Sequence, residues 1–331
     1  MKIFIEPKFT KYYSKYPLVL ADVGASGGLE DNWKPARKYL QIIGFEPDTR
    51  EFNNLIKREN AGTKYLNIGL YNQKISLKYN LMKKQQVSSM FIPNMKFLDQ
   101  FPESDRFEIV EEVEIPVDTL DSQLKVNGIG ELDFIKIDTQ GSELFILEGA
   151  EKTLQKNVFG IEVEVEFIDI YEGQPLFGDV DNFLRKRGFE LFDIQGSYWK
   201  REVGKKYHKK RGQLIFGNAL YLRNAGAFKK IIDQLSEIEE KKAKILKAIS
   251  ICFLYGYFDY AETLLDGFAG IFEDVEQKEI INTFKASQKF FDFGFELKGR
   301  GRLAALIYSL WERVRPTHGG WAVTDRKLGN L

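Results

Sequence analysis

Cysteine and histidine are nearly absent from this chain. Its 331 residues include one cysteine, Cys252, and two histidines, His208 and His318. A single cysteine excludes an internal disulfide and a cysteine-rich zinc site, and it fits a reducing compartment. Because histidine is so scarce, a carboxylate is a better candidate than an imidazole for any general base.

The chain also lacks a charge excess and long apolar runs. Its 48 Lys and Arg residues balance 48 Asp and Glu residues, whereas proteins that follow nucleic acid phosphates normally have a basic excess. We therefore expect no nucleic acid partner. The longest mostly apolar run, residues 249–258, is about half of the roughly 20 residues that a transmembrane helix needs. The N-terminus lacks the apolar core of a signal peptide. These absences predict a cytoplasmic protein without a membrane span.

What the chain does contain in its first two-thirds is an alternation of strand-like and helical stretches. This alternation is typical of an α/β sheet, and 331 residues favour more than one domain. We predict an N-terminal segment (residues 1–16) and an α/β domain (residues 17–224). The expected strands are residues 18–23, 41–46, 65–70, 75–79, 132–138, 159–167, 189–194 and 213–222, and the expected helices are 48–60, 143–155 and 179–187.

The remaining residues, 225–331, show helical periodicity and no strand signal, so we predict an all-helical C-terminal extension. Residues 248–265 resemble one tetratricopeptide-like hairpin. A plain helical hairpin is the alternative, because such repeats stack on one another and no second copy is visible. The extension is a candidate surface for a protein partner or for self-association.

Two features of the α/β region indicate a nucleotide-type ligand. The sequence DVGASGG (residues 22–28) directly follows the first expected strand. Its glycines permit a sharp turn and a close approach to a ligand, beyond the carboxyl ends of the strands. Glu46 ends the second strand about 20 residues further on, where a carboxylate can accept both hydroxyls of an adenosine ribose. A ligand-free turn and a solvated carboxylate are the alternatives. Asp48 fits better as the cap of the next helix.

A longer segment carries a family resemblance. Residues 132–150, LDFIKIDTQGSELFILEGA, closely resemble the signature of the FkbM-type methyltransferases, and LADVGASGG, IGFEPD, PVDTLD and IEVEVEF extend the likeness over residues 17–223. The chain departs from the family at Gln140, where Glu is more common, and at Ser26, where Asn is. The resemblance implies a Rossmann-like seven-stranded class I methyltransferase sheet. It also implies S-adenosyl-L-methionine as cofactor and hydroxyl-bearing acceptors such as a sugar, a glycan or a natural product.

The resemblance also implies positions for the cofactor. Asp22, Gly24, Ala25 and Gly27 would border its methionine part, and Glu46 would hold the ribose. Weaker candidates for cofactor contacts are Asn67 and Ser89, and Asp138 ends the fourth strand where donor and acceptor would meet.

A hydroxyl acceptor needs a group that receives its proton, and Asp138 is the first candidate for this base. Glu164 and Glu166 are the next candidates. Strand alternation puts them, with Glu162, on one face of a strand that should be apolar on both faces. A solvated strand face is the alternative. Asp138 and Glu143 could also offer oxygen ligands to magnesium, but carboxylates near a cofactor are common without a metal, and we assign none.

The identity of the acceptor depends on weaker signals. Residues 200–211, KREVGKKYHKKR, carry seven basic residues and one acidic residue, which fits either a solvated hairpin or a lid that attracts an anionic acceptor. Tyr171 is a candidate acceptor contact. Two other functions stay open. An NAD-binding oxidoreductase could use the same turn and Glu46, although the full G-x-G-x-x-G is missing. A non-catalytic protein could act through its helical tail.

Overall fold

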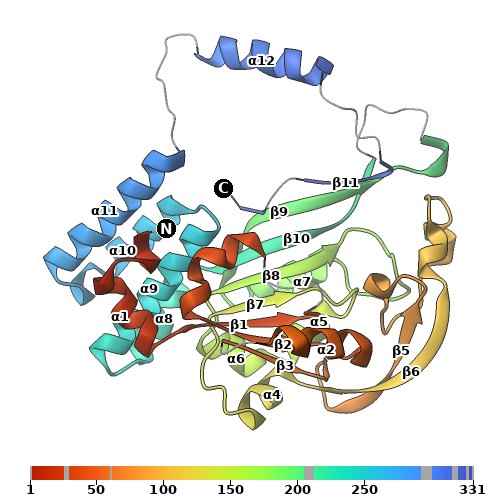
Figure 1. Cartoon of the computed structure of the whole chain (residues 1–331), viewed down its shortest axis with the longest axis horizontal. Helices are drawn as coiled ribbons and strands as arrows, with labels where there is room; N and C mark the ends of the chain where they lie inside the picture. Colours follow the sequence, from red (N-terminus) through yellow and green to blue (C-terminus); the bar gives the residue numbers. More distant parts are fainter. Residues whose placement is uncertain are drawn as a thin grey trace.

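The computed structural model describes residues 2–25, 30–59, 62–204, 212–291, 300–314, 320–325 and 328–329. Its centre is a sheet in the order β11-β9-β10-β8-β7-β1-β2-β3 (Figure 1). The strands are β1 (Leu18–Val23), β2 (Leu40–Phe45), β3 (Thr63–Leu66), β7 (Phe134–Ile137), β8 (Gly160–Glu166), β9 (Phe189–Trp199), β10 (Gln213–Arg223) and β11 (Ala322–Thr324). β3, β2, β1, β7 and β8 are parallel, and β10 runs antiparallel to both β8 and β9.

Seven of these strands confirm the predicted Rossmann-like sheet, and β11 is an addition. β11 pairs with the end of β9, at Ser197 to Trp199. The expectation of an all-helical extension is therefore wrong at this point: a short strand from the C-terminal region covers part of the sheet's edge. Such cover leaves fewer unpaired backbone groups on an edge strand.

Helices cover both faces of the sheet (Figure 1). One face packs against α4 (Leu120–Val126), α5 (Glu143–Glu148), α6 (Glu151–Lys156) and α7 (Phe177–Arg185). The other packs against η1 (Lys2–Phe4), α1 (Pro7–Lys15), η2 (Asp31–Tyr39), α8 (Ala225–Gln234), α9 (Ile238–Leu254) and α10 (Phe258–Gly267). The remaining helices are α2 (Thr49–Leu55), η3 (Ile56–Arg58), η4 (Gln85–Val87), α3 (Met95–Leu98), η5 (Ser104–Phe107), η6 (Glu202–Gly204), η7 (Ala269–Ile271), α11 (Asp274–Phe291) and α12 (Arg300–Val314).

The C-terminal helices share a hydrophobic core with the sheet. Phe253 of α9 is fully buried in the same cluster as Leu20 of β1 and Phe134 of β7. Two lysines of α9, Lys244 and Lys247, also pair with the buried carboxylate that precedes β7, Asp133, at 2.7 and 2.9 Å. The predicted division at residues 224/225 therefore does not coincide with a gap in the packing.

A second, three-stranded sheet lies beside the carboxyl ends of the parallel strands. It has the order β4-β6-β5, with β4 (Gly69–Leu70), β5 (Ile75–Met82) and β6 (Ile109–Asp118). The predicted strand over residues 65–70 is thus divided between the two sheets. The predicted helix over residues 143–155 is likewise divided, into α5 and α6. Between them lies Gly149, which passes so close to the backbone of Tyr71 that any side chain would overlap it.

None of the helices in the described part of the chain combines the length and the apolar character that crossing a bilayer requires.

Candidate active site

The carboxyl ends of β1, β2 and β7 are joined by backbone hydrogen bonds. The N–H of Gly24, just after β1, donates to the carbonyl of Phe45 at the end of β2 at 3.0 Å, and the N–H of Asp138 donates to the carbonyl of Val23 at 3.0 Å. The loops that leave these three strands therefore begin at one place. This is the convergence that the ligand prediction required.

Gly24 is the residue that permits this convergence. Its φ of 78° lies in the left-handed region, and a Cβ at this position would overlap the carbonyl oxygen of Asp138. Only glycine combines that dihedral angle with so close an approach of two backbones. The glycine at position 24 of this sequence signal thus has a structural cause in the contact between the β1 and β7 ends.

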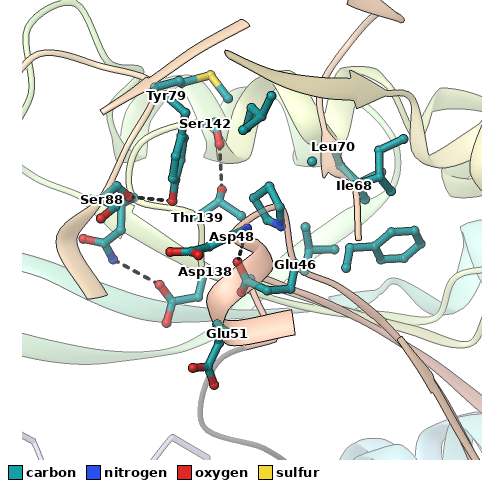
Figure 2. A pocket seen from close by; sticks show the side chains of 18 of the residues that line it. Glu46, Asp48, Glu51, Ile68, Leu70, Tyr79, Ser88, Asp138, Thr139 and Ser142 are labelled. Carbon is teal, nitrogen blue, oxygen red and sulfur yellow. Dashed lines mark hydrogen bonds between the residues drawn. The ribbon is translucent and has the colours of Figure 1, made fainter. Parts of the chain in front are cut away.

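A pocket of about 570 Å³ opens beyond these strand ends (Figure 2). Its floor comes from the loops after β1, β2 and β7, with Gly24, Glu46 and Asp138 among the lining residues. Its apolar walls include Ile68 and Leu70. The second sheet and the segment between its strands β5 and β6 add further lining residues: Tyr79, Gln85, Gln86, Ser88, Met90, Ile115 and Val117.

Glu46 presents a buried carboxylate to this pocket. Among the described residues its carboxylate accepts one hydrogen bond, at Oε1, from the N–H of Asp48 at 2.9 Å. Burial raises the pKa of Glu46 to about 7; the hydrogen bond from the N–H of Asp48 opposes this rise, and the negative charge of Asp48 adds to it. A carboxylate with spare acceptor capacity in a concave site is suited to bind hydroxyl groups of a ligand.

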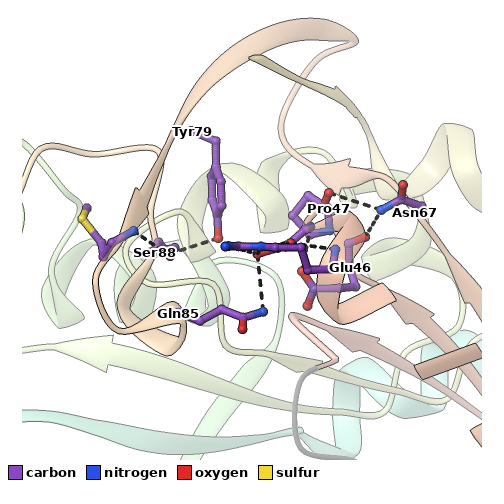
Figure 3. Close-up of polar contacts among 9 residues, drawn as sticks. Glu46, Pro47, Asn67, Tyr79, Gln85 and Ser88 are labelled. Carbon is purple, nitrogen blue, oxygen red and sulfur yellow. Dashed lines mark hydrogen bonds and ion pairs between the residues drawn. The ribbon is translucent and has the colours of Figure 1, made fainter. Parts of the chain in front are cut away.

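The loop that carries Glu46 is held by side chains on both sides (Figure 3). Asp48 caps α2, as predicted, by accepting from the N–H of Arg50 at 2.9 Å, and the guanidinium of Arg50 pairs with it at 2.6 Å. On the other side, Nδ2 of Asn67 donates to the carbonyls of Glu46 and Pro47 at 2.8 and 3.2 Å. Asn67 does not line the pocket. Its side chain instead holds the backbone of the loop that carries Glu46.

Gln140 links two carboxylates at the end of β7. Its Nε2 donates to Oδ1 of Asp138 at 3.1 Å and to Oε2 of Glu164 at 2.5 Å. Gln140 has a φ of 59°, in the left-handed region, which is uncommon for a residue with a side chain. The hydroxyl of Ser89 holds this backbone by donating to the carbonyl of Gln140 at 2.6 Å, and the hydroxyl of Tyr171 donates to Oε1 at 3.2 Å.

Three glutamates form a buried cluster behind Gln140. Ligand oxygens of Glu143, Glu164 and Glu166 all lie within 4.8 Å of one another. Burial raises the pKa of Glu143 to about 7 and raises those of Glu164 and Glu166 well above the ordinary value, and neighbouring carboxylates add to each shift. None of the three lines the pocket, whereas Asp138, which is only partly buried, does.

Asp22 faces the opposite side of the sheet from the pocket walls. Its Oδ1 lies 3.8 Å from Nζ of Lys136, and this lysine also lies 3.7 Å from Oε1 of Glu30. Burial raises the pKa of Asp22, although Lys136 opposes the shift. Oδ1 of Asp22 is buried and accepts no hydrogen bond among the described residues. Glu30 is the first described residue after the glycine turn, so this ion-pair group lies beside the end of that turn.

The structure thus brings Gly24, Glu46 and Asp138 together at one pocket and leaves other candidates at its border. Ala25 is buried next to Gly44 of β2, and Ser89 and Tyr171 are buried residues that contact Gln140. Gly27 and residues 205–211 of the basic loop lie outside the described residues.

Sequence reasoning did not identify several lining residues, among them Tyr79, Ser88, Thr139 and Ser142. The hydroxyl of Tyr79 donates to the carbonyl of Ser88 at 3.1 Å, and that of Ser142 donates to Oγ1 of Thr139 at 2.8 Å (Figure 2). Thr139 and Ser142 lie inside residues 132–150, the segment with the family resemblance, so the sequence did offer a reason to consider these two residues. No pattern in the sequence pointed to Tyr79 or Ser88.

Comparisons with known proteins agree with this geometry. The family model described as the methyltransferase FkbM domain matches residues 22–191, just over half of the chain. No curated protein sequence matches the chain significantly.

Solved structures that resemble the chain include three methyltransferases. The first is the methyltransferase FkbM from Methylobacillus flagellatus KT, at 16% identity and a TM-score of 0.37, over 66% of this chain and 50% of that one. The magnesium protoporphyrin IX methyltransferase ChlM from Synechocystis PCC 6803, with SAM bound, matches at 8% identity and a TM-score of 0.33, over 65% and 76%. Precorrin-6y C5,15-methyltransferase from Geobacter metallireducens GS-15 matches at 12% identity and a TM-score of 0.33, over 67% of this chain and 91% of that one. The chain spans half the length of the first.

Proposed function

Because the chain belongs to the FkbM methyltransferase family, we propose that it transfers a methyl group from S-adenosyl-L-methionine to a hydroxyl group of a sugar, a glycan or a natural product. The observation that carries this proposal is the pocket at which Gly24, Glu46 and Asp138 meet. Among such acceptors, the basic residues of the 200–211 segment favour one with a negative charge.

The residues present fit the cofactor. The Glu46 carboxylate has spare acceptor capacity for the two ribose hydroxyls. The apolar walls at Ile68 and Leu70 can take a flat purine ring. Asp22 precedes the glycine turn but does not line the pocket, and Nζ of Lys136 lies 3.8 Å from its Oδ1, so we assign its carboxylate no direct contact with the cofactor. When bound, S-adenosylmethionine supplies a methyl group on a sulfonium, which is already activated for transfer.

The contribution of the chain's own residues is then alignment, exclusion of water and reception of one proton. Asp138 is the proposed acceptor of the hydroxyl proton, since it lines the pocket and Gln140 fixes one of its oxygens at 3.1 Å. Glu164 contacts the same amide from the buried side, so it supports Asp138 and is the second candidate for the base. Glu166, which is buried with Glu143, is the third.

Two binding measurements separate this proposal from the oxidoreductase alternative. Titration calorimetry of the full chain with S-adenosylhomocysteine and with NAD should show binding of the first and none of the second. The reverse result would overturn the proposal. The alternative of a binding protein that acts through residues 225–331 is tested by incubating the chain with labelled methyl donor and a cell extract, since it predicts no labelled product.

The role of Asp138 is tested in the same extract assay. Asp138→Asn should abolish label transfer and keep affinity for S-adenosylhomocysteine, because the amide retains the shape of the side chain and cannot receive a proton. Glu190→Gln, a change of an exposed carboxylate on β9, is the matched control and should transfer label normally. Full activity of Asp138→Asn would remove this residue from the mechanism.

A further inference from the structure

The helix α12 exposes an unusual amount of apolar surface. All residues of its segment 301–311 are exposed. In Figure 1 the helix stands apart from the sheet and from the other helices. Six of its large apolar side chains are 39–61% exposed: Leu303, Leu306, Ile307, Tyr308, Leu310 and Trp311. Contiguous exposed apolar surface of this kind marks an interaction site.

The apolar residues of α12 are arranged on one side. Leu303, Leu306, Ile307 and Leu310 follow the spacing i, i+3, i+4 and i+7, which places them on a single face of the helix. Arg302 and Ser309 fall on the other side of the helical wheel. The helix is therefore amphipathic, and its apolar face packs against no other described part of the chain.

The aromatic residues and charges of α12 favour one kind of partner. Trp311 lies at the border of the apolar face, with its ring centroid 5.7 Å from that of Tyr308, and tryptophan prefers the boundary between water and lipid. The helix sequence contains three arginines, at positions 300, 302 and 313, and one acidic residue, at position 312. The helix therefore has a net charge of +2, which an identical copy cannot neutralise in either orientation, whereas an anionic surface can.

We propose that α12 binds the anionic surface of a phospholipid bilayer, lying in the plane of the interface. Its apolar face would enter the boundary between headgroups and acyl chains, while Arg302 stays at the level of the lipid phosphates. The helix does not span the membrane, in agreement with the absence of a spanning helix among the described residues. This inference does not depend on the methyltransferase function.

The test is co-sedimentation of the full chain with vesicles. We expect binding to vesicles of phosphatidylcholine with about 30% phosphatidylglycerol, at least about tenfold weaker binding to pure phosphatidylcholine, and a decrease in binding as salt is raised. The double variant Leu306→Asp, Leu310→Asp should lose binding about tenfold or more and keep the folding stability of the parent, because neither side chain is packed. The matched control is Val110→Asp, Val126→Asp, which changes two apolar residues on other elements that are at least as exposed.

Three results would overturn the proposal. The first is no binding to anionic vesicles. The second is equal loss of binding in the control and α12 variants. The third is a dimer, detected by light scattering, that becomes a monomer in the Leu306→Asp, Leu310→Asp variant while vesicles bind neither protein. That last result would assign the face to a second copy of the chain.

Discussion

The hydroxyl of Tyr255, at the end of α9, donates a 2.7 Å hydrogen bond to Oε2 of Glu162 on β8. Nε1 of Trp33 donates to the same hydroxyl at 3.3 Å, and the ring of Tyr255 stacks on Phe134 with centroids 5.5 Å apart. A C-terminal helix is thereby joined to the centre of the sheet. Burial raises the pKa of Glu162 to about 8, and the Tyr255 hydrogen bond opposes that rise.

We predict that Tyr255→Phe lowers the free energy of unfolding by about 1–3 kcal/mol, because it leaves two buried polar partners, Trp33 and Glu162, without their hydrogen bond. Urea denaturation followed by circular dichroism measures this. Tyr308→Phe, at an exposed position, is the control and should unfold as the parent does. An unchanged midpoint in Tyr255→Phe would show that water or another group replaces the hydroxyl.

A second prediction compares two glycines with positive φ. Gly24 and Gly128 have φ values of 78° and 69°, but a Cβ at Gly128 would meet nothing within 4 Å. Gly128→Ala should therefore cost about 1–2 kcal/mol of stability, from the backbone conformation alone. Gly24→Ala should cost about 2–5 kcal/mol, because overlap with Asp138 adds about 1–3 kcal/mol. Thermal denaturation compares them, and equal costs would argue against the close contact of the β1 and β7 ends.

A third prediction concerns the pH dependence of cofactor binding. The pKa of Glu46 is raised to about 7 by burial, and only the ionised form can accept two ribose hydroxyls with both oxygens. Affinity for S-adenosylhomocysteine should therefore increase as the pH rises from about 6 to about 8. Glu46→Ala should weaken binding by about 1–3 kcal/mol and remove this dependence. Calorimetry at both pH values checks it. Glu51→Gln, which changes another carboxylate at the pocket, should retain the slope.

The fourth prediction concerns stability and the buried glutamates. In the folded chain, burial and neighbouring carboxylates hold the pKa of Glu166 well above its ordinary value of 4.5. At pH values between 4.5, the pKa in the unfolded chain, and the raised pKa in the folded chain, the folded state keeps a proton that the unfolded state has released. The free energy of unfolding therefore falls as the pH rises through this window. Glu166→Gln removes this loss, and its gain in melting temperature should be largest near pH 8 and smallest near pH 4.5. The control Glu190→Gln should show no such trend. A pH-independent gain would indicate a packing effect.

The sequence was most informative about the parallel strands and about the strand ends that line the pocket. β1 and β2 were predictable because strands covered on both faces are continuously apolar, and Asp48 was recognisable as a helix cap. Glu46 and Asp138 were recognisable as candidates because each places a carboxylate directly at the end of a buried, apolar strand, where a ligand site is expected.

Other parts depend on contacts that no local pattern encodes. Most of β6 is exposed and its first residues are rich in glutamate, so it lacks the alternation that reveals a half-buried strand. β11 has three residues and pairs with a strand more than 100 positions away. Tyr79 and Ser88 reach the pocket only because the second sheet lies beside it, and that placement is a tertiary property.

The shared core has a consequence for the family-matched segment, residues 22–191. If the chain ended at residue 224, the sheet would present Leu18, Leu20, Phe134, Phe159 and Leu222 to water on the side that α8, α9 and α10 now cover. Asp133 would also lose both lysines that neutralise it. We expect a chain shortened to residues 1–224 to aggregate, because this apolar surface would then be exposed. The C-terminal helices are thus as much a condition for a folded sheet, and for the pocket at its strand ends, as the strands themselves.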